Sequence, residues 1–158
     1  MGSPTDLLAT AFQGFRREAR LTPGYARTAF QAEDKQERHD AILEMRLARP
    51  PVNALDPALV RALKDTFLEA PGTGARAIVL SGTPGLYSGG LDVPALLALD
   101  RAAMQEFWRD FIGLLGAIGR CPVPVVAAIT GHSPAGGAVL AIFCDYRVMA
   151  RATDPAKP

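Results

Sequence analysis

The fold of this chain depends on residues 129–138, which read Ile129-Thr130-Gly131-His132-Ser133-Pro134-Ala135-Gly136-Gly137-Ala138. An apolar run from Val123 to Ile129 leads into the stretch and is typical of a buried strand. A turn of Gly, Ser and Pro then ends the strand, and an apolar helix begins at Gly136. A strand, a tight glycine turn and a helix start direct unpaired backbone N–H groups at one point. The stretch therefore predicts a site for a phosphate, a carboxylate or an oxyanion.

A second stretch of the same kind, residues 79–92, lies upstream, and strands and helices alternate around both. Apolar patterns predict strands over 41–47, 77–81, 125–129 and 146–150. Helices are predicted to start at Asp56-Pro57, near Asp92, at Asp100 and at Gly136. This order predicts an α/β fold with right-handed crossovers and a mostly parallel sheet. Both glycine turns then fall at the carboxyl ends of strands, where such sheets bind ligands.

Composition narrows the function classes. The 158 residues suffice for one domain, and 49% hydrophobic with 21% charged residues fits a globular protein. A net charge of +1 predicts neither nucleic acid nor an anionic membrane as a partner. The apolar runs are interrupted by Pro or charge, so no transmembrane helix is expected. Cys121 and Cys144 lie in apolar segments, which favours free core cysteines over a disulfide. The two histidines and two cysteines give no metal-ligand spacing.

Residues 1–38 are predicted to be a weakly structured N-terminal extension, ahead of an ordered domain over 39–158. Leu7, Leu8, Phe12 and Phe15 could instead line a short interaction helix. The segment also carries several Arg, as a mitochondrial transit peptide does, but its acidic residues argue against that role. A cytoplasmic location is expected, with the mitochondrial matrix as the alternative.

Two familiar glycine motifs are disfavoured by their context. Gly72-Thr73-Gly74 resembles the start of a dinucleotide fingerprint, but it precedes a strand instead of following one. Residues 131–135 resemble the nucleophile elbow of an α/β-hydrolase, with Ala135 in place of the closing glycine. No histidine follows His132 in the chain, so a serine nucleophile at Ser133 would lack its base.

Four motifs in order carry a family resemblance. They are Pro50-Pro51-Val52-Asn53-Ala54-Leu55, Leu86-Tyr87-Ser88-Gly89-Gly90-Leu91-Asp92, Gly131-His132-Ser133-Pro134-Ala135-Gly136-Gly137 and Cys144-Asp145-Tyr146-Arg147. With them, residues 41–158 resemble the enoyl-CoA hydratase/isomerase (crotonase) superfamily, and within it the Δ3,Δ2-enoyl-CoA isomerases most. The resemblance implies a crotonase-like fold of repeated β-β-α units, of which this chain would hold the N-terminal part.

The resemblance also implies a site. The backbone amides of Leu91 and Gly136 would hold the thioester oxygen of an acyl-CoA and stabilise the enolate formed when its neighbouring carbon loses a proton. Contacts to the adenine and pantetheine of coenzyme A would come from Val52, Asn53, Ala54, Gly89 and Gly90. For Asn53 a turn-forming side chain is an equal alternative. His132, Ser133, Asp145 and Arg147 are expected to be structural. Coenzyme A enters as part of the substrate, and no separate cofactor or metal is implied.

The expected reaction moves the double bond of a 3-enoyl-CoA to give 2-trans-enoyl-CoA in fatty acid β-oxidation. The first glutamate of the family's hydratases would fall at Val139, which disfavours water addition. The glutamate of its isomerases would fall beyond Pro158. Glu106 or Asp110 could replace it, although a solvated helix face is the favoured interpretation of both. The alternatives are a CoA-thioester-binding fragment without turnover and a hydratase-like member with other chemistry. The family implies a homotrimer for the full-length protein, and uncovered apolar surface predicts association of this chain.

Overall fold

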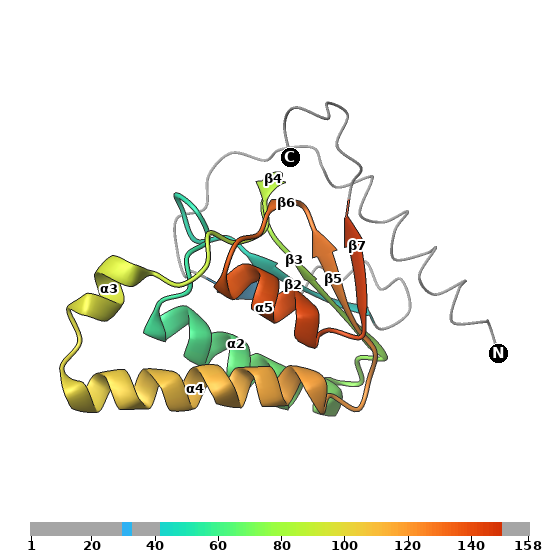
Figure 1. The fold of residues 1–158 in the computed structure, drawn as a ribbon. Coiled ribbons are helices and arrows are strands. Elements are labelled where there is room, and N and C mark those ends of the chain that lie inside the picture. Colours follow the sequence, from blue (N-terminus) through green and yellow to red (C-terminus); the bar gives the residue numbers. More distant parts are fainter. Residues whose placement is uncertain (1–29, 33–41, 150–158) are drawn as a thin grey trace.

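A computed structural model describes residues 30–32 and 42–149, which form the α/β fold in Figure 1. Five strands make one sheet in the order β1-β2-β3-β5-β7. Their bounds are β1 (Phe30–Ala32), β2 (Ile42–Leu47), β3 (Ala77–Ser81), β5 (Val125–Ile129) and β7 (Tyr146–Met149). Neighbours from β2 to β7 pair in parallel, whereas β1 is antiparallel to β2. The predicted α/β class with a mostly parallel sheet is confirmed.

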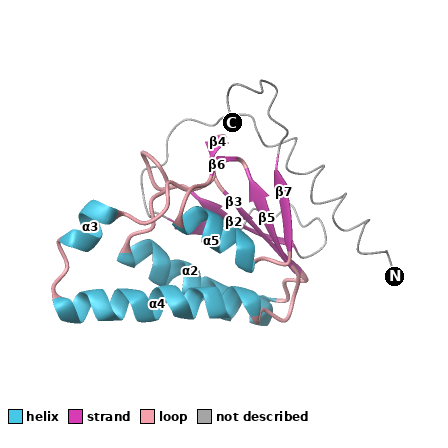
Figure 2. Cartoon of the chain, in the orientation of Figure 1, coloured by secondary structure: helices cyan, strands magenta, loops and turns pink. Residues whose placement is uncertain are grey.

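Three helices cover one face of the sheet, as Figure 2 shows: α2 (Pro57–Glu69), α4 (Arg101–Gly119) and α5 (Gly136–Phe143). The short α3 (Val93–Leu97) and the 3-10 helix η1 (Ala70–Thr73) lie in the connections. The side chains of Asp56, Asp92 and Asp100 accept hydrogen bonds from backbone amides three residues further on, at 2.8, 3.1 and 2.8 Å. The three helix starts predicted from these aspartates are therefore confirmed. Such a cap stabilises a helix by about 1 kcal/mol.

The core lies between the sheet and these helices. Alternate strand residues are buried there, namely Met45, Leu47, Ile78, Leu80, Val125 and Ala127. They join the buried stripe of α2, which consists of Leu59, Val60, Leu63 and Phe67. The alternation in β2 and β3 thus orients one face of each strand toward the helices.

The aromatic residues of α4 divide between the core and the surface. Phe107 and Phe111 are buried, but Trp108 is 44% exposed. Consecutive residues of a helix lie about 100° apart, so Trp108 points away from the face that packs on α2. Its ring meets those of Phe107 and Phe111 edge-on, with centroids 5.4 and 5.9 Å away.

Strand β1 falls inside the segment expected to be a weakly structured extension, and the sequence analysis did not predict it. Phe30 pairs with Leu47 and Ala32 with Met45. The other predictions for residues 1–38, an interaction helix and a transit peptide, lie outside the described residues.

A second, two-stranded sheet joins the two glycine turns. It consists of β4 (Gly85–Leu86) and β6 (Gly131–His132), which pair in parallel. Strand β4 follows β3 and β6 follows β5, so this sheet lies at the carboxyl ends of two neighbouring central strands (Figure 1). The predicted convergence of the turns is confirmed.

The remaining composition-based expectations concern cysteines, membranes and metals. Cys121 and Cys144 are both free, as predicted, and burial raises the pKa of the Cys144 thiol to about 12. No helix in residues 42–149 is long and apolar enough to cross a membrane. Within the same residues, no three His, Cys, Asp or Glu side chains form a group that could hold a metal ion.

Candidate functional site

Backbone hydrogen bonds hold the two glycine turns against each other. The amide of Gly85 donates to the carbonyl of Thr130 at 3.0 Å. The amides of Tyr87 and Ser88 both donate to the carbonyl of His132, at 2.9 and 3.2 Å. A Cβ atom on Gly131 would overlap the carbonyl group of Gly85, so this approach requires glycine. Residues 85–92 therefore run alongside residues 130–137.

The amides of Leu91 and Gly136 meet where the turns end. Gly136 is the first residue of α5, and its amide has no intrahelical acceptor. Leu91 forms a parallel bridge with Leu55, which uses the carbonyl of Gly90 (2.7 Å) and the amide of Asp92 (3.1 Å) and leaves the Leu91 amide unused. Neither amide donates a hydrogen bond to any residue of the described chain. A Cβ atom on Gly136 would lie 3.3 Å from the nitrogen of Leu91, so the two peptide groups adjoin. Two unused N–H groups side by side are the components of an oxyanion hole.

A strained turn precedes the Gly136 amide. The amide of Gly137 donates to the carbonyl of Pro134 at 3.0 Å, which closes a four-residue turn. The second residue of this turn, Ala135, has φ 46° and ψ −116°. These angles correspond to a type II′ turn, in which glycine is the favoured residue. A non-glycine residue in such a region costs about 1–3 kcal/mol, and here the strained peptide lies next to a candidate donor.

Gly90 and Gly89 of the upstream turn each occupy a position that requires glycine, but because of different contacts. Gly90 has φ 89°, and a Cβ atom there would lie 3.2 Å from the Cβ of Ala135 and 3.3 Å from the nitrogen of Gly136. Gly90 therefore permits the close approach of the two turns. The amide of Gly89 donates to the carbonyl of Val52 at 2.7 Å, and a Cβ atom on Gly89 would press on Val52. Gly89 is a residue predicted to contact coenzyme A, and its amide is therefore used inside the protein.

Asn53 connects the turn after β2 to the loop that carries β4. Its side chain is 2% exposed, and its Nδ2 donates to Thr83 Oγ1 and to the carbonyls of Leu86 and Tyr87, at 3.2, 3.3 and 3.2 Å. Its backbone has φ 50°. Of the two interpretations of Asn53, the geometry favours the turn-forming one. Ala54 is also buried, whereas Val52 is 44% exposed and could contact a ligand.

Ser88 ties the same two segments from the other side. Its hydroxyl donates to the carbonyl of Asn53 at 2.8 Å and accepts from the amide of Gly90 at 3.1 Å. Ser88 and Arg49, which pairs with both Asp56 and Asp92, were not singled out from the sequence. Ser88 lies within one of the four family motifs, but its acceptor Asn53 is distant in the chain, so only the fold identifies that contact.

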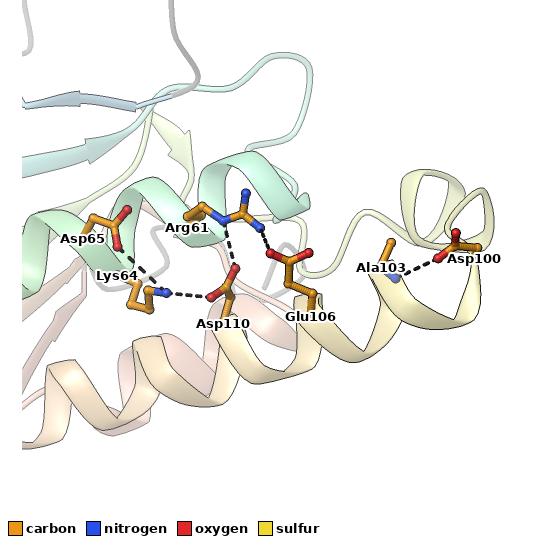
Figure 3. A network of polar contacts seen from close by, with 7 residues as sticks. All are labelled: Arg61, Lys64, Asp65, Asp100, Ala103, Glu106 and Asp110. Carbon is orange, nitrogen blue, oxygen red and sulfur yellow. Dashed lines mark hydrogen bonds and ion pairs between the residues drawn. The ribbon is translucent and has the colours of Figure 1, made fainter.

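Glu106 and Asp110, the two candidates for a replacement base, face α2 (Figure 3). The carboxylate of Asp110 accepts from Lys64 Nζ at 2.6 Å and from Arg61 Nε at 3.0 Å, while Glu106 accepts from Arg61 Nη2 at 2.9 Å. The hydrogen bond from Lys64, aided by Arg61, outweighs burial and lowers the pKa of Asp110. Asp110 is only 8% exposed, so the expected solvated face is wrong for this residue. A paired carboxylate of lowered pKa is a poor general base.

The structural roles expected for Asp145 and Arg147 are confirmed. The carboxylate of Asp145 accepts from the amide of Val125 at 2.8 Å. Arg147 Nη1 donates to the carbonyls of Ala141, Ile142 and Cys144, which end α5. Arg147 thereby satisfies acceptors that a helix leaves unpaired at its C-terminus.

The parallel sheet, the helices on one face and the paired glycine turns together define a crotonase-type fold. The crystal structure of human mitochondrial delta3-delta2-enoyl-CoA isomerase has this architecture and superposes with a TM-score of 0.64, at 28% identity, over 68% of this chain and 42% of that one. A family model described as enoyl-CoA hydratase/isomerase matches residues 37–157, so this chain belongs to that family.

Two curated relatives illustrate the range of the family. Enoyl-CoA delta isomerase 1, mitochondrial, of Mus musculus is 36% identical over 108 residues, which cover 67% of this chain and 37% of the mouse protein. The peroxisomal bifunctional enzyme of Homo sapiens is 35% identical over 111 residues, which cover 70% of this chain and 15% of that protein. The chain thus spans well under half the length of these relatives.

Proposed function

We propose that this chain binds the thioester group of an acyl-CoA and contributes the oxyanion hole of an enoyl-CoA isomerase. The observation that carries the proposal is the pair of unused amides, Leu91 and Gly136, in adjoining peptide groups. The similarity to a mitochondrial enoyl-CoA delta isomerase supports an enoyl-CoA as the substrate.

The geometry suits the chemistry of this reaction. Removing a proton from C2 of a 3-enoyl-CoA moves negative charge onto the thioester oxygen. Returning the proton at C4 yields the conjugated 2-enoyl-CoA, so no atom is gained or lost. Each fixed N–H donor at such an oxygen accelerates the reaction by about 10²–10³. Leu91 and Gly136 would act through their main chains, so their side chains need carry no polar group.

One residue, Val139, favours isomerisation over hydration as the reaction. The resemblance places the first glutamate of the hydratases at Val139, an apolar residue that is partly buried against the core. Val139 cannot transfer a proton. The proton carrier of an isomerase would, by the same resemblance, fall beyond Pro158. Glu106 and Asp110 are unsuitable replacements because Arg61 and Lys64 hold their carboxylates.

The pairing of those two carboxylates also favours a second candidate function. In it, residues 1–158 by themselves bind a CoA thioester without converting it. The names of the mouse and human relatives favour a mitochondrial or peroxisomal setting over the cytoplasm. A homotrimer stays a prediction from the family resemblance.

The test follows the absorbance of the conjugated thioester when the chain is mixed with a 3-enoyl-CoA, alongside calorimetric binding of the same ligand. Gly136→Pro removes the candidate donor and adds side-chain atoms. Gly136→Ala is its matched control, because it adds a Cβ atom close to Leu55 and Leu91 but keeps the N–H. Binding that is lost with Pro and retained with Ala supports the oxyanion hole. Turnover by the parent chain selects the isomerase, and binding without turnover selects the second candidate. No binding by the parent chain contradicts both.

A further inference from the structure

Arg49 lies just beyond the end of β2 and places its guanidinium between two aspartates that start different helices. Its Nε lies 3.1 Å from Oδ2 of Asp56, and its Nη1 lies 2.8 Å from Oδ2 of Asp92. Nη1 also donates to the carbonyl of Ala54 at 3.2 Å. The three charged side chains are mostly buried, with 26%, 18% and 16% of their surfaces exposed. The pair of contacts joins the segment before α2 to the segment before α3.

Each aspartate uses its two oxygens for different purposes. Oδ1 of Asp56 accepts from the amide of Leu59, and Oδ1 of Asp92 accepts from the amide of Ala95, so these oxygens cap α2 and α3. Both Oδ2 atoms are left for Arg49. The amide of Ala95, together with Arg49, lowers the pKa of Asp92. The guanidinium of Arg49 thus meets one oxygen of each carboxylate.

The position of these aspartates relates Arg49 to the candidate site. Asp56 follows Leu55 and Asp92 follows Leu91, and Leu55 and Leu91 are the two partners of the parallel bridge. Leu55 donates to Gly90 and accepts from Asp92, on either side of the unused Leu91 amide. Arg49 thus holds together the residues directly after both bridge partners.

We propose that Arg49 is a positioning residue that sets the direction of the Leu91 amide by clamping the two segments joined by the Leu55–Leu91 bridge. The inference rests on the proposed function, in which that amide holds the thioester oxygen. Without the guanidinium, two mostly buried carboxylates would face each other across the bridge. Their repulsion would separate Leu55 from Leu91. The fork geometry matters as well, because one ammonium group cannot reproduce directed bonds from Nε and Nη1.

The experiment compares three variants of the full chain. Arg49→Met removes the charge and retains most of the length, and Arg49→Lys retains the charge without the fork. Arg46→Met is the matched control, since Arg46 lies on the same segment and pairs with Glu44 on β2. The first readout is hydrogen exchange of the Leu55 and Asp92 amides, which needs no ligand. The second is binding and turnover of a 3-enoyl-CoA.

Arg49→Met is expected to speed exchange at the Leu55 and Asp92 amides at least tenfold, with the β3 amides unchanged. The exchange rates of Arg49→Lys are expected to lie between those of Arg49→Met and the parent chain, and those of Arg46→Met to match the parent. Adding Asp92→Asn to Arg49→Met is expected to slow the exchange again, because the repulsion disappears while Asn can still cap α3. Thioester affinity, or kcat where the parent turns over, is expected to fall about tenfold in Arg49→Met.

The outcomes separate this inference from the proposed function. Unchanged exchange at both amides in Arg49→Met and Arg49→Lys would overturn the clamp. Faster exchange with unchanged thioester binding and turnover would overturn the positioning role and leave the proposed function intact. A parent chain that binds no thioester contradicts the proposed function, whereas the exchange rates alone then decide whether Arg49 directs the bridge. If the β3 amides of Arg49→Met lose all protection from exchange, the variant is globally unfolded. The Arg49→Lys variant then decides whether the clamp exists.

Discussion

Neighbouring residues Tyr87 and Ser88 each bury a hydroxyl group, and we expect removal of the two hydroxyls to have opposite effects on stability. Both residues are fully buried. The hydroxyl of Tyr87 has no hydrogen-bond partner in the described chain, whereas that of Ser88 has two. Tyr87→Phe and Ser88→Ala each delete one oxygen from the same loop, so comparing them isolates the effect of having a hydrogen-bond partner.

The magnitudes follow from the contacts. An unpaired buried hydroxyl costs about 1–3 kcal/mol. Its removal leaves a void on the order of 10 Å³, which costs about 0.2 kcal/mol. Tyr87→Phe is therefore expected to raise the free energy of unfolding by about 1 kcal/mol or more. Ser88→Ala leaves the carbonyl of Asn53 and the amide of Gly90 without their partner, so it is expected to lower that free energy by about 2–4 kcal/mol.

Urea unfolding of the 158-residue chain, followed by circular dichroism, measures both changes. Tyr87→Phe should move the midpoint upward at an unchanged slope, and Ser88→Ala should move it downward. At this chain length, 1 kcal/mol corresponds to about 2–4 °C in Tm. A Tyr87→Phe variant less stable than the parent would refute the reasoning, because the hydroxyl would then have a stabilising partner. Equal losses in both variants would show that packing alone determines the effect.

Three further outcomes are expected. Burial raises the pKa of Tyr87 well above 10.0, so as pH rises the tyrosine ionises in the unfolded state before it ionises in the folded state. The parent should therefore lose stability relative to Tyr87→Phe as pH rises above 10.0. Parallel curves of stability against pH for the two proteins would contradict this. Ala135→Gly should relieve the strain of the type II′ turn and stabilise the chain by about 1 kcal/mol, measured as Tm; a lower Tm would show that the turn is not strained. Asp110→Asn should cost about 1–3 kcal/mol at neutral pH. Because the folded pKa of Asp110 is lowered, this loss should shrink as pH falls below 3.8 in acid titrations, and a loss independent of pH would exclude the ion pairs as its cause.

Local chemistry explains which parts of the fold were predictable. Asp56, Asp92 and Asp100 mark helix starts because an N-cap carboxylate acts within three residues of itself. The convergence of the two glycine turns followed from a rule about parallel sheets, since carboxyl ends of neighbouring strands meet at one edge. Strands β4 and β6 were not predicted, because two residues are too short to show any periodicity. Strand β1 depends on pairing with β2, which its own sequence does not reveal.

The candidate site shows the same division. Leu91 and Gly136 could be named from motifs, and the structure places their amides side by side. The burial of Asp110 could not be predicted from the sequence, because it depends on Arg61 and Lys64 of another helix. Asn53 allowed two interpretations until its three acceptors were known. Interactions between distant segments therefore account for most of what the sequence left open.

The proposed oxyanion hole consists of backbone amides, so side-chain substitutions would act on it indirectly. The two candidate donors carry no functional side chain, so replacing the side chain of Leu91 leaves its N–H in place. The directions of the two N–H groups depend instead on what holds residues 90–92 and 134–137: the hydroxyl of Ser88, the guanidinium of Arg49 and the turn at Ala135. Because catalysis by fixed donors depends on their aim, substitutions at these supporting residues should impair thioester binding more than truncation of the Leu91 side chain. In the proposed function the main chain would carry the chemistry, and the sequence would specify it through the residues that orient that chain.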